Sequence, residues 1–169
     1  MTRNIPSSVK KSLEQEASPD VLLAFLTIEN EALVEPIRIV SDVLDYDLAG
    51  DFFLGFPFDF KLISDNNSAP ETELVIQNVD REIGIAIRKS VSRAKVKMEI
   101  YSSADFDLTV NPRVEIGTAT KIYGFVNFDL VSVKVSNDSI TGRVVTVDTS
   151  TEPWPQERAT QDRCPGLFR

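Results

Sequence analysis

The chain has 169 residues, with 18 Lys or Arg against 26 Asp or Glu, and its formal net charge is -8. It contains no histidine and a single cysteine, which excludes Ser-His-Asp and Cys-His catalytic centres, an intrachain disulfide and a thiolate zinc site. The acidic balance argues against specific binding to nucleic acid, which requires a basic face. We therefore predict a protein that is not an enzyme and uses no cofactor or metal.

The hydropathy pattern indicates a protein that is neither secreted nor embedded in a membrane. No window approaches the roughly 20 consecutive apolar residues of a membrane-spanning helix. The first residues also lack the apolar stretch of a signal peptide. We expect residues 1–149 to form a single β-rich domain, since a chain of this length can bury a sizeable core.

The first predicted element is an amphipathic helix over residues 6–17. Val9 and Leu13 lie four residues apart, and lysines and glutamates occupy the other face. A helix with so thin an apolar stripe normally packs on its own domain, and we expect it to flank the sheet.

The next elements are two strands that form a hairpin. Residues 21–28 are almost continuously apolar, which is typical of a strand buried on both faces. After a polar turn, Ile37 and Ile39 alternate with Arg38 and Val40, which predicts an antiparallel partner strand.

Four aspartates then follow in a short segment: Asp42, Asp45, Asp47 and Asp51. A calcium-binding loop would require a bidentate glutamate at its twelfth position, and with Asp45 as the first position that place holds Phe56. We therefore predict a solvated acidic turn without a metal.

Residues 52–60 contain five of the ten phenylalanines. The spacing of Phe52, Phe56, Phe58 and Phe60 predicts that they share one strand face, and Pro57 indicates an edge strand or a bulge. Two interpretations stay open at this point: these rings pack in the core, or they are buried against a second subunit.

The following stretch is predicted to be mostly β, with one inner helix over residues 80–91. Asp80 is a suitable N-cap for that helix, and apolar residues recur every four positions after it. Alternation or β-branched runs predict strands over residues 72–77, 94–102, 106–110, 114–120, 122–135 and 140–147. The fold class is therefore mainly β (α+β), an antiparallel sandwich or barrel with one or two flanking helices.

Residues 150–169 contain three prolines and no strand period, which predicts an extended C-terminal arm. Its apolar anchors are Trp154, Leu167 and Phe168. Such an arm docks either on its own sheet or on a neighbouring subunit, and the sequence leaves both open.

Three segments together resemble a known family: Glu35-Pro36-Ile37-Arg38-Ile39-Val40-Ser41-Asp42, Gln77-Asn78-Val79-Asp80-Arg81 and Cys164-Pro165-Gly166-Leu167-Phe168. The chain resembles the small tail-assembly proteins of long-tailed phages (siphophages), whose gene lies between those of the tape-measure protein and a cell-wall-peptidase-like tail protein. The resemblance implies a virion component of the tail tip or baseplate, made in the host cytoplasm, with the fold of tail-tube proteins. It brings no catalytic residues.

The resemblance further implies a distal-tail-like ring, hexameric in the favoured form, that joins the tail tube to the hub. Its expected partners are further copies of itself, the tail-tube protein, the tape-measure protein and the hub or peptidase-like tail proteins, and genomic DNA would pass through the channel. Closed rings repeat one heterologous interface, so each protomer needs two complementary patches. The candidate interface residues are Phe52, Phe53, Phe56 and Phe58 in the phenylalanine segment, and Trp154, Arg158, Arg163, Leu167 and Phe168 in the arm.

Two alternatives remain beside this reading. One is a hub-like trimeric tail-tip protein, because subunits cannot be counted from sequence. The other is a module that binds host glycans, in which Trp154 would provide a stacking surface.

Overall fold

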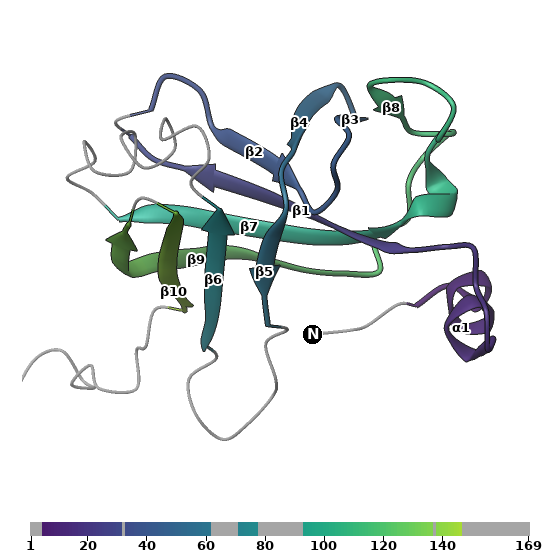
Figure 1. Ribbon diagram of the computed structural model, residues 1–169, viewed down its shortest axis with the longest axis horizontal. Helices are drawn as coiled ribbons and strands as arrows, with labels where there is room; N and C mark the ends of the chain where they lie inside the picture. The colour runs from purple at the N-terminus through teal and green to yellow at the C-terminus, as the bar shows by residue number, and fades with distance from the viewer. Residues whose placement is uncertain (1–4, 32, 62–70, 78–92, 137, 147–169) are drawn as a thin grey trace, which may run out of the picture.

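The computed structural model describes residues 5–31, 33–61, 71–77, 93–136 and 138–146, and over these ranges the chain is mainly β (Figure 1). They contain a single α-helix, α1 (Ser7–Glu14), and one 3-10 helix, η1 (Ser103–Asp105). The strands are β1 (Leu22–Glu29), β2 (Ile37–Val40), β3 (Tyr46–Leu48), β4 (Asp51–Gly55), β5 (Phe58–Phe60), β6 (Glu71–Gln77), β7 (Ala94–Ser102), β8 (Arg113–Val114), β9 (Tyr123–Val135) and β10 (Ser139–Val145). The predicted helix over 80–91 and the arm over 150–169 lie outside the described residues.

All ten strands belong to one sheet, in the order β5-β6-β10-β9-β7-β1-β2-β4-β3-β8. The mainly-β prediction is confirmed, as are the strands predicted at 21–28, 72–77 and 94–102 and the β1–β2 hairpin. The expectation of a purely antiparallel sheet is wrong at two pairings, because β4 runs parallel to β2 and β8 runs parallel to β3. Two chain reversals separate β2 from β4, so β4 returns in the direction of β2.

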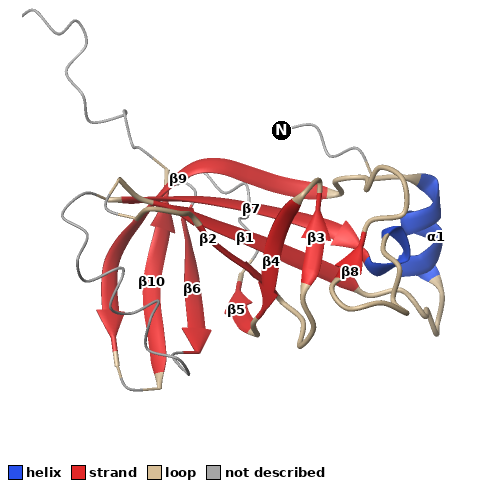
Figure 2. Ribbon diagram, turned by 90° about the horizontal axis from the view of Figure 1, so that it is seen from above, coloured by secondary structure: helices blue, strands red, loops and turns tan. Residues whose placement is uncertain are grey.

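The sheet curls into a half-barrel (Figures 1 and 2). β4 pairs with β2 and β5 pairs with β6, near opposite ends of the strand order, yet only Phe56 and Pro57 separate β4 from β5 along the chain. One short segment therefore bridges two distant parts of the sheet. Pro57 lies between the two strands, where its missing N–H removes no ladder bond.

Two hydrophobic clusters form the core, on the two faces of the sheet. The larger cluster fills the half-barrel and takes buried residues from β1, β2, β5, β6, β7, β9 and β10, together with Phe56. The smaller cluster lies on the opposite face and includes Tyr46, Phe53 and Phe106. β1 contributes Ala24, Leu26 and Ile28 to the first and Leu23 and Phe25 to the second, which explains its continuous apolar sequence.

Three predicted elements differ from the structure. The helix ends at Glu14 instead of Ala17, and Leu13 is 59% exposed, so Val9 is the buried residue of α1. The strands predicted over 106–110 and 114–120 are wrong, because this stretch forms turns, the two-residue strand β8 and an isolated bridge from Phe106 to Glu115. Its apolar residues alternate, but Leu108 and Val110 are exposed and pack on no core. Among the described residues, no helix is long and apolar enough to cross a bilayer.

Candidate interaction surface

Residues 42–55 and 105–116 form what we call the β3–β4–β8 lobe, at one end of the sheet (Figure 1). An aromatic cluster attaches this lobe to the main sheet. The ring of Phe25 in β1 lies 5.0 Å from Phe53, 5.5 Å from Phe106 and 5.7 Å from Tyr46, centroid to centroid. Edge-to-face and offset pairs of this kind contribute about 0.5–1.5 kcal/mol each beyond their buried area, so they hold the lobe in a fixed position.

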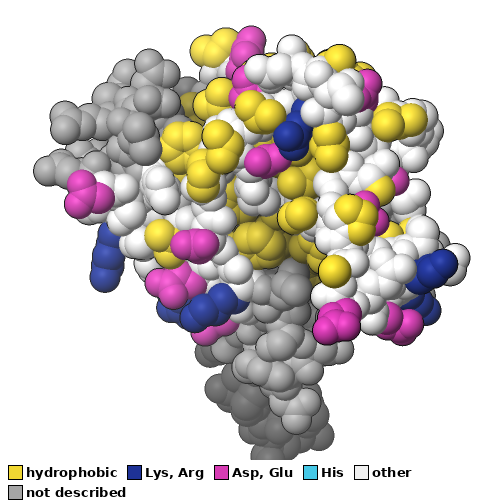
Figure 3. All heavy atoms as spheres, turned by 45° about the vertical axis from the view of Figure 1, so that its right-hand side comes forward, with side chains coloured by type: hydrophobic (Ala, Val, Ile, Leu, Met, Phe, Trp, Pro, Cys, Tyr) yellow, Lys and Arg dark blue, Asp and Glu magenta, His cyan; other side chains and the backbone are white. Residues whose placement is uncertain are grey.

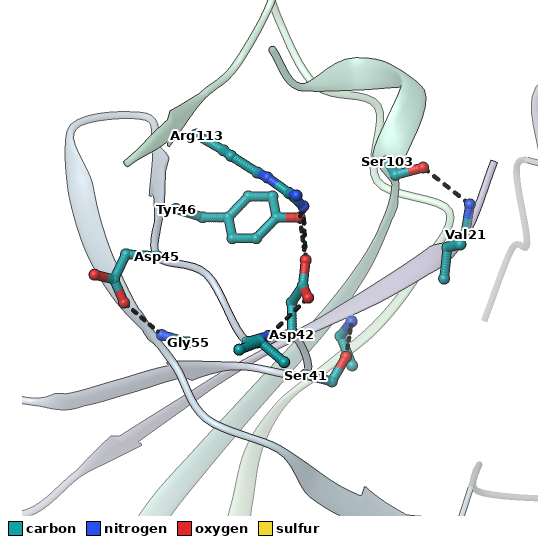
Figure 4. Close-up of polar contacts among 10 residues, drawn as sticks. Val21, Ser41, Asp42, Asp45, Tyr46, Gly55, Ser103 and Arg113 are labelled. Carbon is teal, nitrogen blue, oxygen red and sulfur yellow. Dashed lines mark hydrogen bonds and ion pairs between the residues drawn. The ribbon is translucent and has the colours of Figure 1, made fainter. Parts of the chain in front are cut away.

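Asp42, Tyr46 and Arg113 form a hydrogen-bonded triangle on the inner side of the lobe, which we call the polar triangle (Figure 4). Tyr46 Oη donates to Asp42 Oδ2 at 2.6 Å, and Arg113 Nη1 donates to both Asp42 Oδ2 at 2.7 Å and Tyr46 Oη at 2.5 Å. The Arg113 guanidinium also lies 5.4 Å from the Tyr46 ring centroid. The triangle therefore joins the segment after β2, strand β3 and strand β8, which the sequence separates by up to 71 residues.

The Tyr46 side chain is fully buried, and this burial raises its pKa to about 12, with a further contribution from the hydrogen bond to Asp42. The phenol is therefore a neutral donor at physiological pH. Arg113 Nε is buried without a hydrogen-bond partner among the described residues. Nη1 of the same guanidinium pairs with Asp42, so the triangle ties strand β8 to the segment after β2.

The acidic segment is more ordered than the solvated turn that the sequence predicts, because it includes β3 and the start of β4, Asp42 pairs with Arg113, and two further carboxylates accept from backbone amides. Asp45 Oδ1 accepts from the Gly55 amide at 2.8 Å, and Asp47 Oδ1 accepts from the Gly50 amide at 3.0 Å. Gly55 is required here, since a Cβ on it would lie 2.6 Å from the Leu44 carbonyl. No group of three or more potential metal ligands occurs in the described ranges.

Two serine hydroxyls just before the segments of the lobe accept main-chain hydrogen bonds from β1 and from the residue before it (Figure 4). Ser41 Oγ accepts from the Ala24 amide at 2.9 Å, and Ser103 Oγ accepts from the Val21 amide at 2.9 Å. They hold the points where the chain enters the lobe, while the rings and the polar triangle hold the lobe itself.

That outer surface is apolar to an unusual degree. Phe52, Asp47 and Val114 are cross-strand neighbours on β4, β3 and β8, and they lie on the face opposite to Phe53 and Tyr46. Phe52 is 52% exposed. Of the thirteen exposed large hydrophobic residues in the described ranges, eight belong to the lobe: Val43, Leu44, Phe52, Leu54, Leu108, Val110, Val114 and Ile116.

Figure 3 shows hydrophobic side chains gathered over the upper part of the molecule, at the height where β3, β4 and β8 lie in Figure 1. Isolated exposed apolar residues are ordinary on a soluble protein, whereas a concentration of them marks a surface that binds something. The lobe is therefore the strongest candidate interaction surface in the described part of the chain.

The candidate residues from the sequence divide between the core, the surface and the part of the chain that is not described. Phe53, Phe56 and Phe58 are buried in the protomer's own core, while Phe52 is exposed on the lobe. The predicted shared face is right for Phe56, Phe58 and Phe60, which join one core cluster, and wrong for Phe52.

The arm residues Trp154, Arg158, Arg163, Leu167 and Phe168 lie outside the described residues, so their interface role stays a prediction. Sequence reasoning missed the other apolar residues of the lobe. The only sequence signal for these residues is the apolar alternation over 106–120, and that alternation predicts strands.

The model of the family described as "Domain of unknown function (DUF1833)" matches residues 8–158, most of the chain. The chain belongs to the DUF1833 family. A search of curated proteins gives no match.

The fold of this DUF1833 chain is similar to that of a chain in a solved structure described as "Virion of native gene transfer agent (GTA) particle". The TM-score is 0.60 and the sequence identity is 14%. The likeness covers 92% of this chain and 48% of the other, so this chain spans about half the length of that protein. The shared property is the fold.

Proposed function

We propose that this DUF1833 chain is a structural subunit of a phage-type virion, located at the tail tip, where copies of it form a ring between the tail tube and the hub. The observation that carries the proposal is the fold, which matches a chain of a gene transfer agent virion over 92% of this chain. The resemblance to small tail-assembly proteins, seen independently in the sequence, supports the tail tip as the position within the virion.

The lobe supports an assembly role in physical terms. Assembly subunits bury apolar surface against one another, and stable interfaces bury about 800 Å² on each partner. Eight exposed apolar side chains on a rigid lobe are suited to such an interface. The sequence offers no histidine-based chemistry that would compete with this role.

The proposed partners are other copies of the chain in a hexameric ring, the tail-tube protein, the tape-measure protein and the hub. A trimeric, hub-like arrangement is the close variant of the same proposal. With a net charge of -8, the ring would repel DNA that passes through its channel.

Cryo-electron microscopy of intact particles that carry a tagged copy of this chain tests the position. We expect the tag in a ring of density at the tail tip, with sixfold symmetry; threefold symmetry would favour the hub-like variant. A tag on the head, or particles that assemble fully without the chain, would overturn the proposal. The untagged particle is the control for added density.

A further inference from the structure

We infer that neighbouring copies of this chain bind head to tail, with the β3–β4–β8 lobe of one copy docked on the outer face of β7 of the next. This inference rests on the proposed ring and specifies which surfaces close it. It follows from the charge and exposure of two separate surfaces of the described chain.

The receiving surface is a row of exposed cations along β7, which we call the basic ridge: Arg93, Lys95, Lys97 and Lys121. Asp129 pairs with Lys95 at 2.5 Å and with Arg93 at 3.8 Å, and Glu99 pairs with Lys97 at 2.9 Å and with Lys121 at 3.2 Å.

The cations of the basic ridge are much more exposed to solvent than the carboxylates that pair with them. The four cationic side chains are 41–73% exposed, whereas the carboxylate side chains of Asp129 and Glu99 are only 6% and 13% exposed. The carboxylates of Asp129 and Glu99 lie beneath the cations. Glu29 of β1 is exposed and lies directly opposite Lys95, so an approaching molecule meets mainly ammonium and guanidinium groups with one exposed carboxylate beside them.

An apolar residue adjoins the ridge. The β7–β9 register shifts between Val96 and Met98, so Val126 and Asn127 both lie opposite Lys97 in a bulge. Val126 is 51% exposed. The ridge thus combines exposed positive charge with an exposed apolar side chain. A surface that is both acidic and apolar would be complementary to it.

The lobe is such a surface. Its two segments contain seven acidic residues and one basic residue, Arg113. Asp42 is paired with Arg113, and Asp51 is paired with Arg38 of β2. The other acids bind backbone amides or hydroxyls, which leaves their negative charge uncompensated.

Most of the ridge lies apart from the lobe on one protomer. The lobe is at one end of the sheet, whereas β7 begins at the other end, beside the last residues of β1, so Arg93 and Lys95 lie far from the lobe (Figure 1). Lys121, just before β9, is the part of the ridge that adjoins the lobe, because the preceding Thr120 donates to Asp105. A surface at one end that complements a different surface elsewhere on the same molecule generates a heterologous contact, and such contacts close into rings when the rotation allows. A lobe-to-lobe pairing would instead bring like charges together, which is unfavourable.

Two variants of the full-length chain, each defective in one surface, test the inference. Phe52→Lys disables the lobe at an exposed position, and Val34→Lys, at a fully exposed residue of the β1–β2 connection, is its control. The double variant Lys97→Glu/Val126→Glu disables the ridge while Glu99 keeps Lys121 as a partner. Lys10→Glu/Leu13→Glu on α1 introduces the same charge change at exposed positions and is its control.

Native mass spectrometry and sedimentation of the purified chains give the readout. We expect each defective variant to associate at least about tenfold more weakly than the wild-type chain, the scale of losing an interface anchor, and both controls to assemble normally. Added salt should weaken wild-type association, because the attraction is between opposite charges. A 1:1 mixture of the two defective variants should form dimers that grow no further, since each variant keeps one intact surface.

The outcomes separate this inference from the ring itself. A wild-type chain that stays monomeric overturns the ring, and this interface with it. A wild-type oligomer whose assembly is unaffected by either defective variant overturns the interface alone. A ridge variant that still forms dimers by itself, while Phe52→Lys does not, would show a lobe-to-lobe contact and likewise refute head-to-tail binding.

Discussion

Replacing Tyr46 by phenylalanine removes one hydroxyl from the triangle with Asp42 and Arg113 and leaves the aromatic ring in place. The hydroxyl donates to Asp42 at 2.6 Å and lies 2.5 Å from Arg113 Nη1. The direct contact between Asp42 and Arg113 at 2.7 Å survives the substitution. The variant therefore isolates what one buried phenol contributes to the stability of the fold.

The magnitude follows from the hydrogen bonds that the hydroxyl makes to charged partners. A hydrogen bond to a charged group contributes about 1.5–3 kcal/mol. We expect Tyr46→Phe to lower the free energy of unfolding by about 2 kcal/mol at neutral pH, as measured by urea denaturation followed by circular dichroism.

The same phenol makes stability depend on alkaline pH. Its folded pKa of about 12 lies above its usual value of 10.0, so the folded state binds this proton more tightly than the unfolded state. The stabilisation is complete below about pH 10 and is lost as the pH rises to about 12. The difference between wild type and Tyr46→Phe should therefore shrink to nearly nothing over that interval.

Tyr101→Phe is the matched control. Burial raises the Tyr101 pKa to about 12 as well, but this hydroxyl makes no hydrogen bond among the described residues. Tyr101→Phe should change stability at neutral pH by less than about 0.5 kcal/mol. If Tyr46→Phe also changed the free energy of unfolding by less than about 0.5 kcal/mol at neutral pH, the Tyr46 hydroxyl would make no measurable contribution, and the expectation would be refuted.

Four further substitutions have defined expected effects on thermal or urea unfolding. Gly55→Ala should cost about 1–3 kcal/mol, because the new Cβ would meet the neighbouring backbone at 2.6 Å; a neutral result would contradict that packing. Phe53→Ala should cost about 3–5 kcal/mol, whereas Phe52→Ala should leave the monomer within about 0.5 kcal/mol of wild type, since the two rings are 4% and 52% exposed. Lys95→Ala should cost about 3 kcal/mol or more, because Asp129 would be left buried with a partner 3.8 Å away; a change below about 1 kcal/mol would mean that this pair behaves like a surface salt bridge.

Much of the main sheet follows from sequence, because burial on a defined face imposes a readable pattern. The apolar run at 21–28 predicts a strand buried on both faces, and Ala24 and Phe25 do point into different clusters. The alternation of residues 94–102 predicts β7 at the bounds observed. These strands pair over long antiparallel registers, so local pattern and tertiary environment agree.

The lobe was less predictable, because long-range contacts decide its structure. Arg113 and Tyr46 are 67 residues apart, and no local pattern indicates that they meet. Leu108 and Val110 alternate like strand residues but are exposed, and they belong to neither hydrophobic cluster of the described residues. The candidate surface is thus located where the sequence pattern and the observed burial disagree.

The segment from β4 to β5, which connects the β2 side of the sheet to the β6 side, affects where the sheet can open. β5 is paired with β6 by only three residue pairs, whereas β1 is paired with β7 by eight. Because local opening occurs preferentially where few interactions must break, the half-barrel should open between β5 and β6 before it opens between β1 and β7. Amide hydrogens of β5 should then exchange with solvent faster than those of β1. Separation of this one short strand from β6 would give solvent access to the interior of the half-barrel.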